Sequence, residues 1–223
     1  MSEEQPFFDE ETEKNLPALL EHLPEPVKLV VWGDPEATEF EKQAVRLCEE
    51  LSSRFKTISY TTRPRRVNYD YYPVIGVMGG DAEDTGDHSW EDFGVRVIGL
   101  PAGYSMTSFI TAVQAVSFRG MTLDAMTRIK LKQLTDKVNI QVISAANNEG
   151  GAIVAQPAFN MAVVSANIRT LYIMSDQFPA ITTKYSIDIV PHMVINGRVH
   201  ISGVIDEGDM LKQVAQAVKT API

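Results

Sequence analysis

The chain has 223 residues, of which 44% are hydrophobic and 22% charged, and its formal net charge is −9. Such a composition is typical of soluble folded domains, and the negative charge disfavours nucleic acid and anionic lipid as partners. No apolar run approaches the roughly 18 residues of a membrane span. The acidic start, Met1–Glu4, lacks a signal-peptide core, and the single cysteine, Cys48, excludes an intrachain disulfide. We therefore expect a cytoplasmic protein without a membrane partner.

The first half of the chain shows alternating strand and helix patterns. Apolar residues recur at helical spacing from Phe40 to Phe55, and Pro24 and Pro26 end an earlier amphipathic segment. The elements expected, in chain order, are a helix over Asp9–Leu23, a strand over Val27–Trp32, a helix over about Glu36–Arg54 opened by Asp34 or Pro35, strands over Thr57–Thr62, Pro73–Met78 and Phe93–Leu100, and a helix over Ser105–Phe118.

The second half repeats a similar order. The expected elements are a helix over Thr122–Leu134 capped by Thr122, a strand over Val138–Ser144, a helix over Glu149–Val164, a strand over Ile168–Met174, a short helix over Phe178–Tyr185, strands over Pro191–Ile195 and Val199–Ile205, and a helix over Asp206–Lys219 capped by Asp206. Asn196-Gly197 predicts a two-residue type I′ hairpin turn. The repeated order indicates an internal duplication, with a tail and helix over 1–26, a first unit over 27–120 and a second over 121–223.

Three stretches resemble a known family. Phe93–Gly103, which contains Gly-Leu-Pro-Ala-Gly, is similar to the centre of the tandem thioredoxin-fold proteins, and Pro26–Val31 and Ile189–Gly197 resemble the same proteins. These are the protein disulfide oxidoreductases and the N-terminal domain of the alkyl hydroperoxide reductase flavoprotein. The resemblance implies an α/β fold of two fused thioredoxin-like units, each a central mixed sheet flanked by helices.

The resemblance also implies a redox site, and its cysteines are missing. In that family a Cys-x-x-Cys motif opens the first long helix of a unit, where the helix dipole lowers a thiol pKa. Aligned on this chain, the motif falls on Asn148-Glu149-Gly150-Gly151 in the second unit and on Asp34-Pro35-Glu36-Ala37 in the first. Where the family often carries a proton-transferring glutamate, this chain has Ser105. The thiols and the acid are lost together, so we expect no catalytic residue.

Two functions follow from this pattern. The first is a redox-inactive, thioredoxin-like binding or scaffold protein that engages a protein or peptide partner through the cis-proline groove, which the resemblance places at Val190-Pro191. The expected binding residues are Asn148, Glu149, Gly150, Gly151, Val190 and Pro191. The alternative is an enzyme related to the thiol-disulfide oxidoreductases, or an accessory reductase domain, that uses single-cysteine chemistry. The sequence has no dinucleotide fingerprint or phosphate-binding loop, so no cofactor is expected.

Other candidate sites have plainer interpretations. Cys48 lies on an apolar helical stripe, which favours a buried structural thiol. In a two-residue hairpin Ile195 would face Arg198, which puts His192 and His200 on opposite faces. This arrangement argues against a shared metal. Two further groups stand out in the sequence. The first is an acidic loop that is expected to be solvated, Asp81, Glu83, Asp84, Asp87, His88, Glu91 and Asp92. The second group mixes aromatic and basic residues, and we expect it to serve in ordinary packing or as a protein-interaction surface. Its members are Tyr60, Arg63, Arg65, Arg66, Tyr69, Tyr71 and Tyr72.

Overall fold

A computed structural model of the chain describes residues 6–80 and 90–219. The strands in this part are β1 (Val27–Trp32), β2 (Ile58–Arg63), β3 (Val74–Gly79), β4 (Glu91–Ile98), β5 (Val138–Ser144), β6 (Ile168–Met174), β7 (His192–Ile195) and β8 (Val199–Ser202). The helices are α1 (Glu10–Leu20), α2 (Glu39–Arg54), α3 (Tyr104–Ser117), α4 (Ala125–Lys132), α5 (Glu149–Val164), α6 (Ala180–Tyr185) and α7 (Glu207–Lys219). The predicted order of elements is confirmed.

The strands form one mixed eight-stranded sheet, in the order β2-β1-β3-β4-β6-β5-β7-β8. The order β2-β1-β3-β4 recurs as β6-β5-β7-β8. In each half the first two strands of the chain pair in parallel across a long helix, and the last two pair antiparallel. The halves join where β4 pairs in parallel with β6. The fold therefore consists of two fused thioredoxin-like units, and the unit limits at 26/27 and 120/121 stay predictions.

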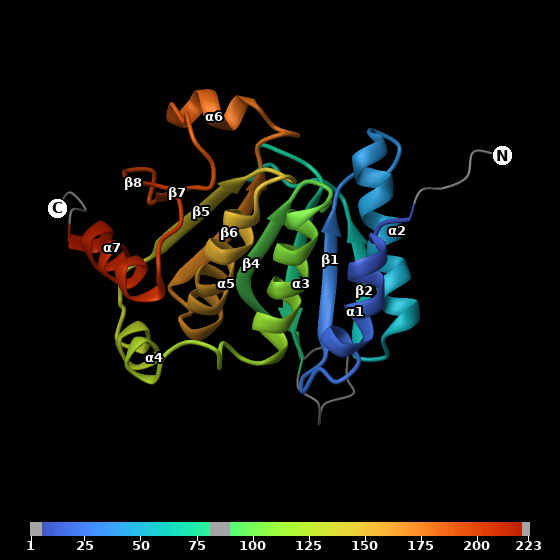
Figure 1. Ribbon diagram of the computed structural model, residues 1–223, viewed down its shortest axis with the longest axis horizontal. Helices are drawn as coiled ribbons and strands as arrows, with labels where there is room; N and C mark the ends of the chain where they lie inside the picture. Colours follow the sequence, from blue (N-terminus) through green and yellow to red (C-terminus); the bar gives the residue numbers. More distant parts are fainter. Residues whose placement is uncertain (1–5, 81–89, 220–223) are drawn as a thin grey trace.

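The two faces of the sheet pack against different elements. Side chains alternate along a strand, so Val27, Leu29 and Val31 of β1 face the main core while Lys28 and Trp32 face the other way. The long helices α2, α3 and α5 lie together over the first face (Figure 1). The second face packs against the segment 64–72 and α6, which contribute a smaller apolar cluster. The two faces therefore present different chemistry.

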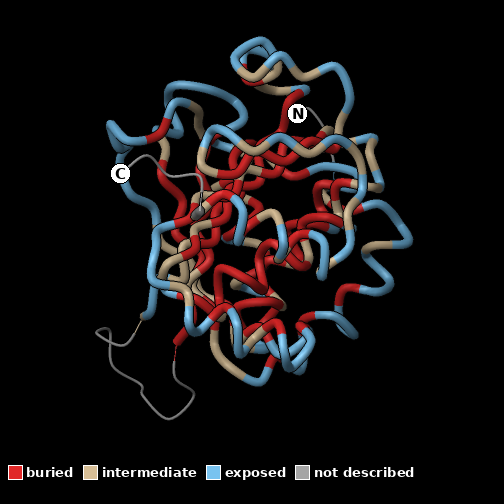
Figure 2. The backbone as a smooth tube through the Cα atoms, turned by 90° about the vertical axis from the view of Figure 1, so that its left-hand side faces the viewer, coloured by how far each residue is buried: buried red, intermediate tan, exposed pale blue. Residues whose placement is uncertain are grey.

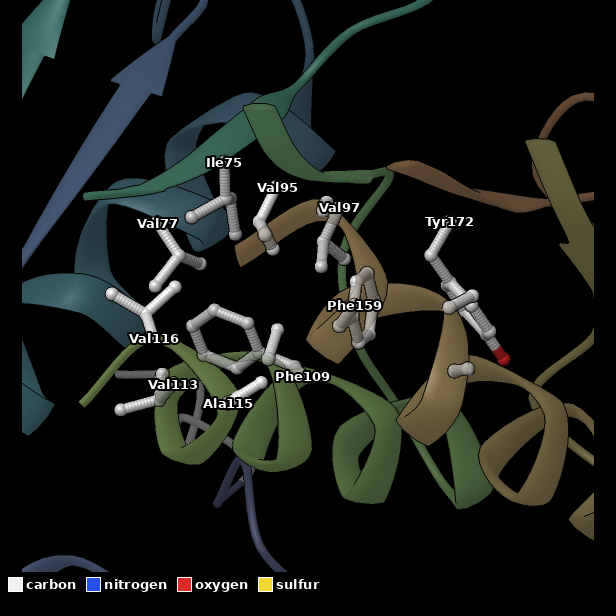
Figure 3. Packing of buried hydrophobic residues seen from close by; sticks show 14 of the residues in the cluster. Ile75, Val77, Val95, Val97, Phe109, Val113, Ala115, Val116, Phe159 and Tyr172 are labelled. Atoms are coloured by element: carbon white, nitrogen blue, oxygen red, sulfur yellow. The ribbon is translucent and has the colours of Figure 1, made fainter. Parts of the chain in front are cut away.

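Helices α3 and α5 pack against each other across the junction of the two halves. Phe109 of α3 and Phe159 of α5 are both fully buried there, next to Val97 of β4 (Figure 3). Buried segments run continuously through the middle of the molecule (Figure 2). The two units therefore share one hydrophobic core, which fixes the position of the start of α5. In the described residues, no helix has both the length and the apolar character needed to cross a membrane.

Two helices start about three residues later than predicted. Helix α2 begins at Glu39, because Thr38 and not Asp34 or Pro35 provides the N-cap: the Glu41 amide donates to Thr38 Oγ1 over 3.2 Å. Helix α4 begins at Ala125, because the Asp124 carboxylate caps it in place of Thr122. In both cases a side chain nearer the helix competes successfully for the free amide groups. The predicted Asp206 cap of α7 is present, and Asp206 Oδ1 accepts from the Asp209 amide over 2.8 Å.

Candidate functional site

Asn148 stands at the helix start where the resemblance places a first cysteine. It is the N-cap of α5: its Oδ1 accepts from the Gly151 amide over 3.0 Å, and its Nδ2 donates to the Val190 carbonyl over 2.8 Å. The structure thus brings the helix start and the Val190-Pro191 loop into direct contact. A thiol is a weak donor and acceptor, and a cysteine here would give up both hydrogen bonds.

Gly151 stands where the second cysteine would be, and it has no room for a side chain. A Cβ built there would lie 2.7 Å from Ser144 Cβ and 3.0 Å from the Tyr172 hydroxyl, with Ser144 Oγ closer still. Real Cβ atoms essentially never come nearer than 3.0 Å to another heavy atom, as this one would to both serine atoms. Both side chains come from strands beneath α5 and are fully buried, and Figure 3 shows the Tyr172 ring beside this helix. The space of the second thiol is therefore filled by the sheet.

Three exposed apolar side chains surround the same helix start. Ile189, Ile153 and Val204 are 64%, 53% and 56% exposed. Ile189 precedes Val190, Ile153 lies one turn along α5 from Gly150, and Val204 Cγ2 lies 2.9 Å from where a Gly150 Cβ would be. Single exposed apolar residues are ordinary, but a group beside one loop marks a candidate contact surface. We call this surface the Val190 groove.

The first unit has a matching loop that is closed by a buried carboxylate. Glu41 Oε1 accepts from the Asp34 amide and from Arg65 Nε, each over 2.8 Å, and Glu41 Oε2 accepts from Thr38 Oγ1 over 2.8 Å. The Glu41 side chain is 1% exposed. The segment Asp34–Ala37 is therefore held at Asp34 by a hydrogen bond to Glu41, and it carries no thiol.

Both units have a cis proline before their third strand. The Val190-Pro191 bond is cis, as the resemblance implies, and so is the Tyr72-Pro73 bond, which was not predicted from the sequence. The signal was available, because Pro73 stands directly before β3 as Pro191 stands directly before β7.

Ser105 takes a structural role at the start of α3. Its Oγ donates to the Ala102 carbonyl over 2.6 Å and accepts from the Ala102 amide over 2.9 Å. The side chain is fully buried. Because its hydroxyl is used in this turn and ionises far above neutral pH, Ser105 cannot replace a proton-transferring carboxylate.

Cys48 is fully buried on the core side of α2, as predicted, and burial raises the pKa of its thiol. A thiolate is the reactive form, so both access and ionisation oppose chemistry. We expect iodoacetamide at pH 8 to alkylate Cys48 about 1,000-fold more slowly in the native protein than in urea, because labelling requires opening of the core. Mass spectrometry of the alkylated protein over time measures the ratio of the two labelling rates. Rapid native labelling would instead support the single-cysteine alternative.

His192 and His200 lie on one face of the hairpin, which contradicts the prediction. His192 Nε2 lies 3.1 Å from His200 Nδ1. The turn does use Asn196-Gly197 with positive φ at both residues, but Ile195 pairs with Val199 instead of Arg198. One extra residue in the loop shifts the register, and a shift of one residue moves side chains to the opposite face. Among the described residues, no group of three or more His, Cys, Asp or Glu side chains is placed to hold a metal.

This pair predicts a pH dependence of stability. Burial and the neighbouring His200 lower the pKa of His192 below its ordinary value of 6.5. As the pH falls below 6.5 the unfolded state takes up this proton first, so the free energy of unfolding falls through the folded-state pKa. His192→Gln should therefore flatten the decrease between pH 7.5 and 5.5 in urea unfolding. His22→Gln, which removes an exposed histidine outside this pair, is the matched control. The same decrease in all three proteins would contradict the assignment.

In the aromatic and basic segment, Tyr69, Tyr71 and Tyr72 pack on the second sheet face, whereas its three arginines are exposed. Tyr71 stacks on Phe178, with ring centroids 4.9 Å apart, and Lys184 pairs with Asp70 over 3.1 Å. These contacts connect the first unit to the α6 region of the second. Of the predicted acidic loop, Glu91 and Asp92 begin β4, and the others lie outside the described residues.

Comparisons with known proteins agree with this fold. A family model described as a thioredoxin domain matches residues 138–216. An alkylhydroperoxide reductase protein of Enterococcus faecalis, AhpF in a mutant form, is 19% identical with a TM-score of 0.81, covering 94% of this chain and 100% of that one. A protein disulfide oxidoreductase of Aeropyrum pernix is 20% identical with a TM-score of 0.80, covering 96% of each chain. No curated protein matches the sequence. At these identities the similarity establishes the fold, and the activity has to be argued from the site.

Proposed function

We propose that this chain, a two-unit thioredoxin-like protein, is a redox-inactive binding subunit that holds an extended peptide segment of a partner at the Val190 groove. One observation carries the redox part of the proposal: the sheet beneath α5 occupies the space that a side chain at Gly151 would need. Besides the absence of two thiols, the packing of Ser144 and Tyr172 leaves no room for the second cysteine side chain.

The binding part of the proposal rests on the surface that remains. Asn148 ties the Val190 carbonyl to the helix start, which holds the loop in one position. The apolar side chains Ile189, Ile153 and Val204 stand exposed around it. A fixed loop with exposed apolar neighbours suits an extended apolar segment, whose alternate side chains can bury this surface.

An uncharged ten-residue peptide of alternating Val and Gln, labelled for fluorescence anisotropy, provides a direct test. We expect it to bind the wild-type chain, and the double variant Ile189→Asp, Val204→Asp to weaken binding at least about tenfold, since each charge would have to be buried. The matched control is Met126→Asp, Ile129→Asp on α4, which changes two side chains of similar exposure that are not part of the groove. Absence of peptide binding, or an equal loss of affinity in both double variants, would refute the proposal that the Val190 groove binds a peptide.

A further inference from the structure

Positive charge gathers on the second sheet face, although the whole chain is acidic. Two shallow hollows lie there, one of about 650 Å³ and one of about 560 Å³. Arg66 lines both of them. The larger is also lined by Arg96, Lys137 and Arg169, and the smaller by Lys28, Arg63 and Arg65. Seven of the chain's 20 basic residues thus line one continuous surface, which we call the basic trough.

Two of these cations are neutralised within the fold. Arg65 pairs with the buried Glu41 over 2.5 Å. Arg96 is buried and pairs with Asp92 through both carboxylate oxygens, over 2.8 and 2.5 Å. Burial opposes the charge of Asp92, but the Arg96 hydrogen bonds outweigh it and lower the pKa of this carboxyl. Asp92 is the one carboxylate among the described residues that line the trough, and its charge is already used.

Four more of the seven cations have no such carboxylate partner among the described residues. Arg63, Arg66, Lys137 and Arg169 form no ion pair with any carboxylate in the part of the chain that the structure describes. The Arg169 Nε is buried and makes no hydrogen bond. Four uncompensated positive charges on a protein of net charge −9 form a local field that attracts an anionic ligand.

The aromatic rings in the trough decide between two kinds of polyanion. The Trp32 ring has the guanidinium groups of Arg66 and Arg96 each 4.9 Å from its centroid. The Trp90 ring has Lys28 Nζ at 4.9 Å, and the Tyr69 ring has Arg169 at 5.0 Å. Single-stranded nucleic acid depends on free aromatic faces on which its bases stack. Here the protein's own cations occupy those faces, so the trough suits carboxylates better than bases.

We propose that the basic trough binds an acidic polypeptide segment of a partner protein, laid across both hollows along the second sheet face. The hollows are open and joined through Arg66, and this shape fits an extended chain with several carboxylates better than a compact anion held in one hollow. The site uses no residue of the Val190 groove, so it goes beyond the proposed function. It gives this fold a second, electrostatic contact for a partner.

Anisotropy with a labelled peptide of eight glutamates tests the trough. We expect binding at 50 mM salt that weakens as salt rises, because screening reduces such contacts. Arg63→Gln alters the smaller hollow alone and Lys137→Gln the larger alone, and each should weaken binding about threefold or more. The double control Lys14→Gln, Lys42→Gln removes two exposed charges from helices outside the trough and should have no effect.

Four outcomes would overturn the proposal. One is no binding of the glutamate peptide at 50 mM salt, and another is equal weakening by the control. The third is tighter binding of an eight-residue oligothymidine than of the glutamate peptide, which would assign the surface to nucleic acid. The fourth is an effect of only one of the two single variants, which would contradict an extended ligand. The uncharged peptide used for the Val190 groove should be unaffected by these variants, so each proposal can fail without the other.

Discussion

Placing cysteines at Asn148 and Gly151 is expected to leave the protein without disulfide exchange activity and to destabilise it. Both thiols of a Cys-x-x-Cys motif would then be present at a helix start, where the dipole favours a thiolate. The Cβ at position 151, however, would overlap Ser144 and Tyr172, and the new residue at 148 would lose the hydrogen bond to Val190. The helix start would have to move before the two sulfurs could work together.

The packing part of this expectation can be measured with a smaller change. Gly151→Ala should lower the free energy of unfolding by about 1–3 kcal/mol, the usual cost of overpacking a core. Elsewhere in a helix the same substitution is favourable by up to about 1 kcal/mol. Gly208 in α7 is the control, because a Cβ there meets only Asp206 Oδ1 at 3.5 Å. Urea unfolding of both variants gives the comparison.

A rescue variant separates local overlap from general damage. Adding Ser144→Gly to Gly151→Ala removes both serine atoms that the new methyl group would meet. It should recover part of the lost stability, although glycine itself weakens a strand. If Gly151→Ala were as stable as the wild-type chain, the sheet beneath α5 would have room for a thiol, and the redox site would be lost only by substitution.

The second large effect is expected at Glu41. Glu41→Gln should lower the free energy of unfolding by about 2–3 kcal/mol at pH 7, because it replaces a buried carboxylate that accepts from Asp34, Thr38 and Arg65. This loss of stability is smaller than that expected on breaking a fully buried ion pair, because Arg65 is 44% exposed and water can hydrate its charge. Glu39→Gln, at an exposed position of the same helix, should change stability by less than about 0.5 kcal/mol.

The same carboxylate predicts an acid dependence. Burial raises the pKa of Glu41, but hydrogen bonds from Arg65, the Asp34 amide and Thr38 outweigh it, so the pKa lies below its ordinary value of 4.5. The stabilisation is therefore complete above that value and is lost as the pH falls through the lower folded-state pKa. The difference in stability between wild type and Glu41→Gln should shrink as the pH is lowered from 6 to 3. A difference that stays constant over this range would contradict the assignment.

Much of the fold could be predicted because local signals agreed. The bounds of β5, α5 and β6 match the prediction at both ends, since hydrophobic runs and turn residues mark the same positions. The start of α2 was misplaced although Thr38 and Glu41 have the spacing of a capping box, which is readable in the sequence, and Thr38 does cap the helix. The hairpin register was wrong because an Asn-Gly pair fixes the turn but not whether one more residue follows before pairing resumes.

The candidate site was less predictable, for a physical reason. The sequence shows that cysteines are missing at Asn148 and Gly151, and in the structure Asn148 and Gly150 lie against the Val190-Pro191 loop. The sequence does not show that a side chain at position 151 lacks room, because the atoms that fill this space come from β5 and β6. The basic trough was only partly visible in the sequence, which singled out Arg63, Arg65 and Arg66. Lys137 and Arg169 join Arg66 through the pairing of β4, β6 and β5.

Reduction of insulin by dithiothreitol, followed as turbidity at pH 7, tests most directly whether this thioredoxin-like protein has lost redox chemistry. The native chain should leave the rate equal to that of dithiothreitol alone at every protein concentration, because its one thiol is buried in the core. Cys48→Ala supplies the matched protein without any thiol and should give the same rate. An acceleration that grows with protein concentration and disappears in Cys48→Ala would contradict the account.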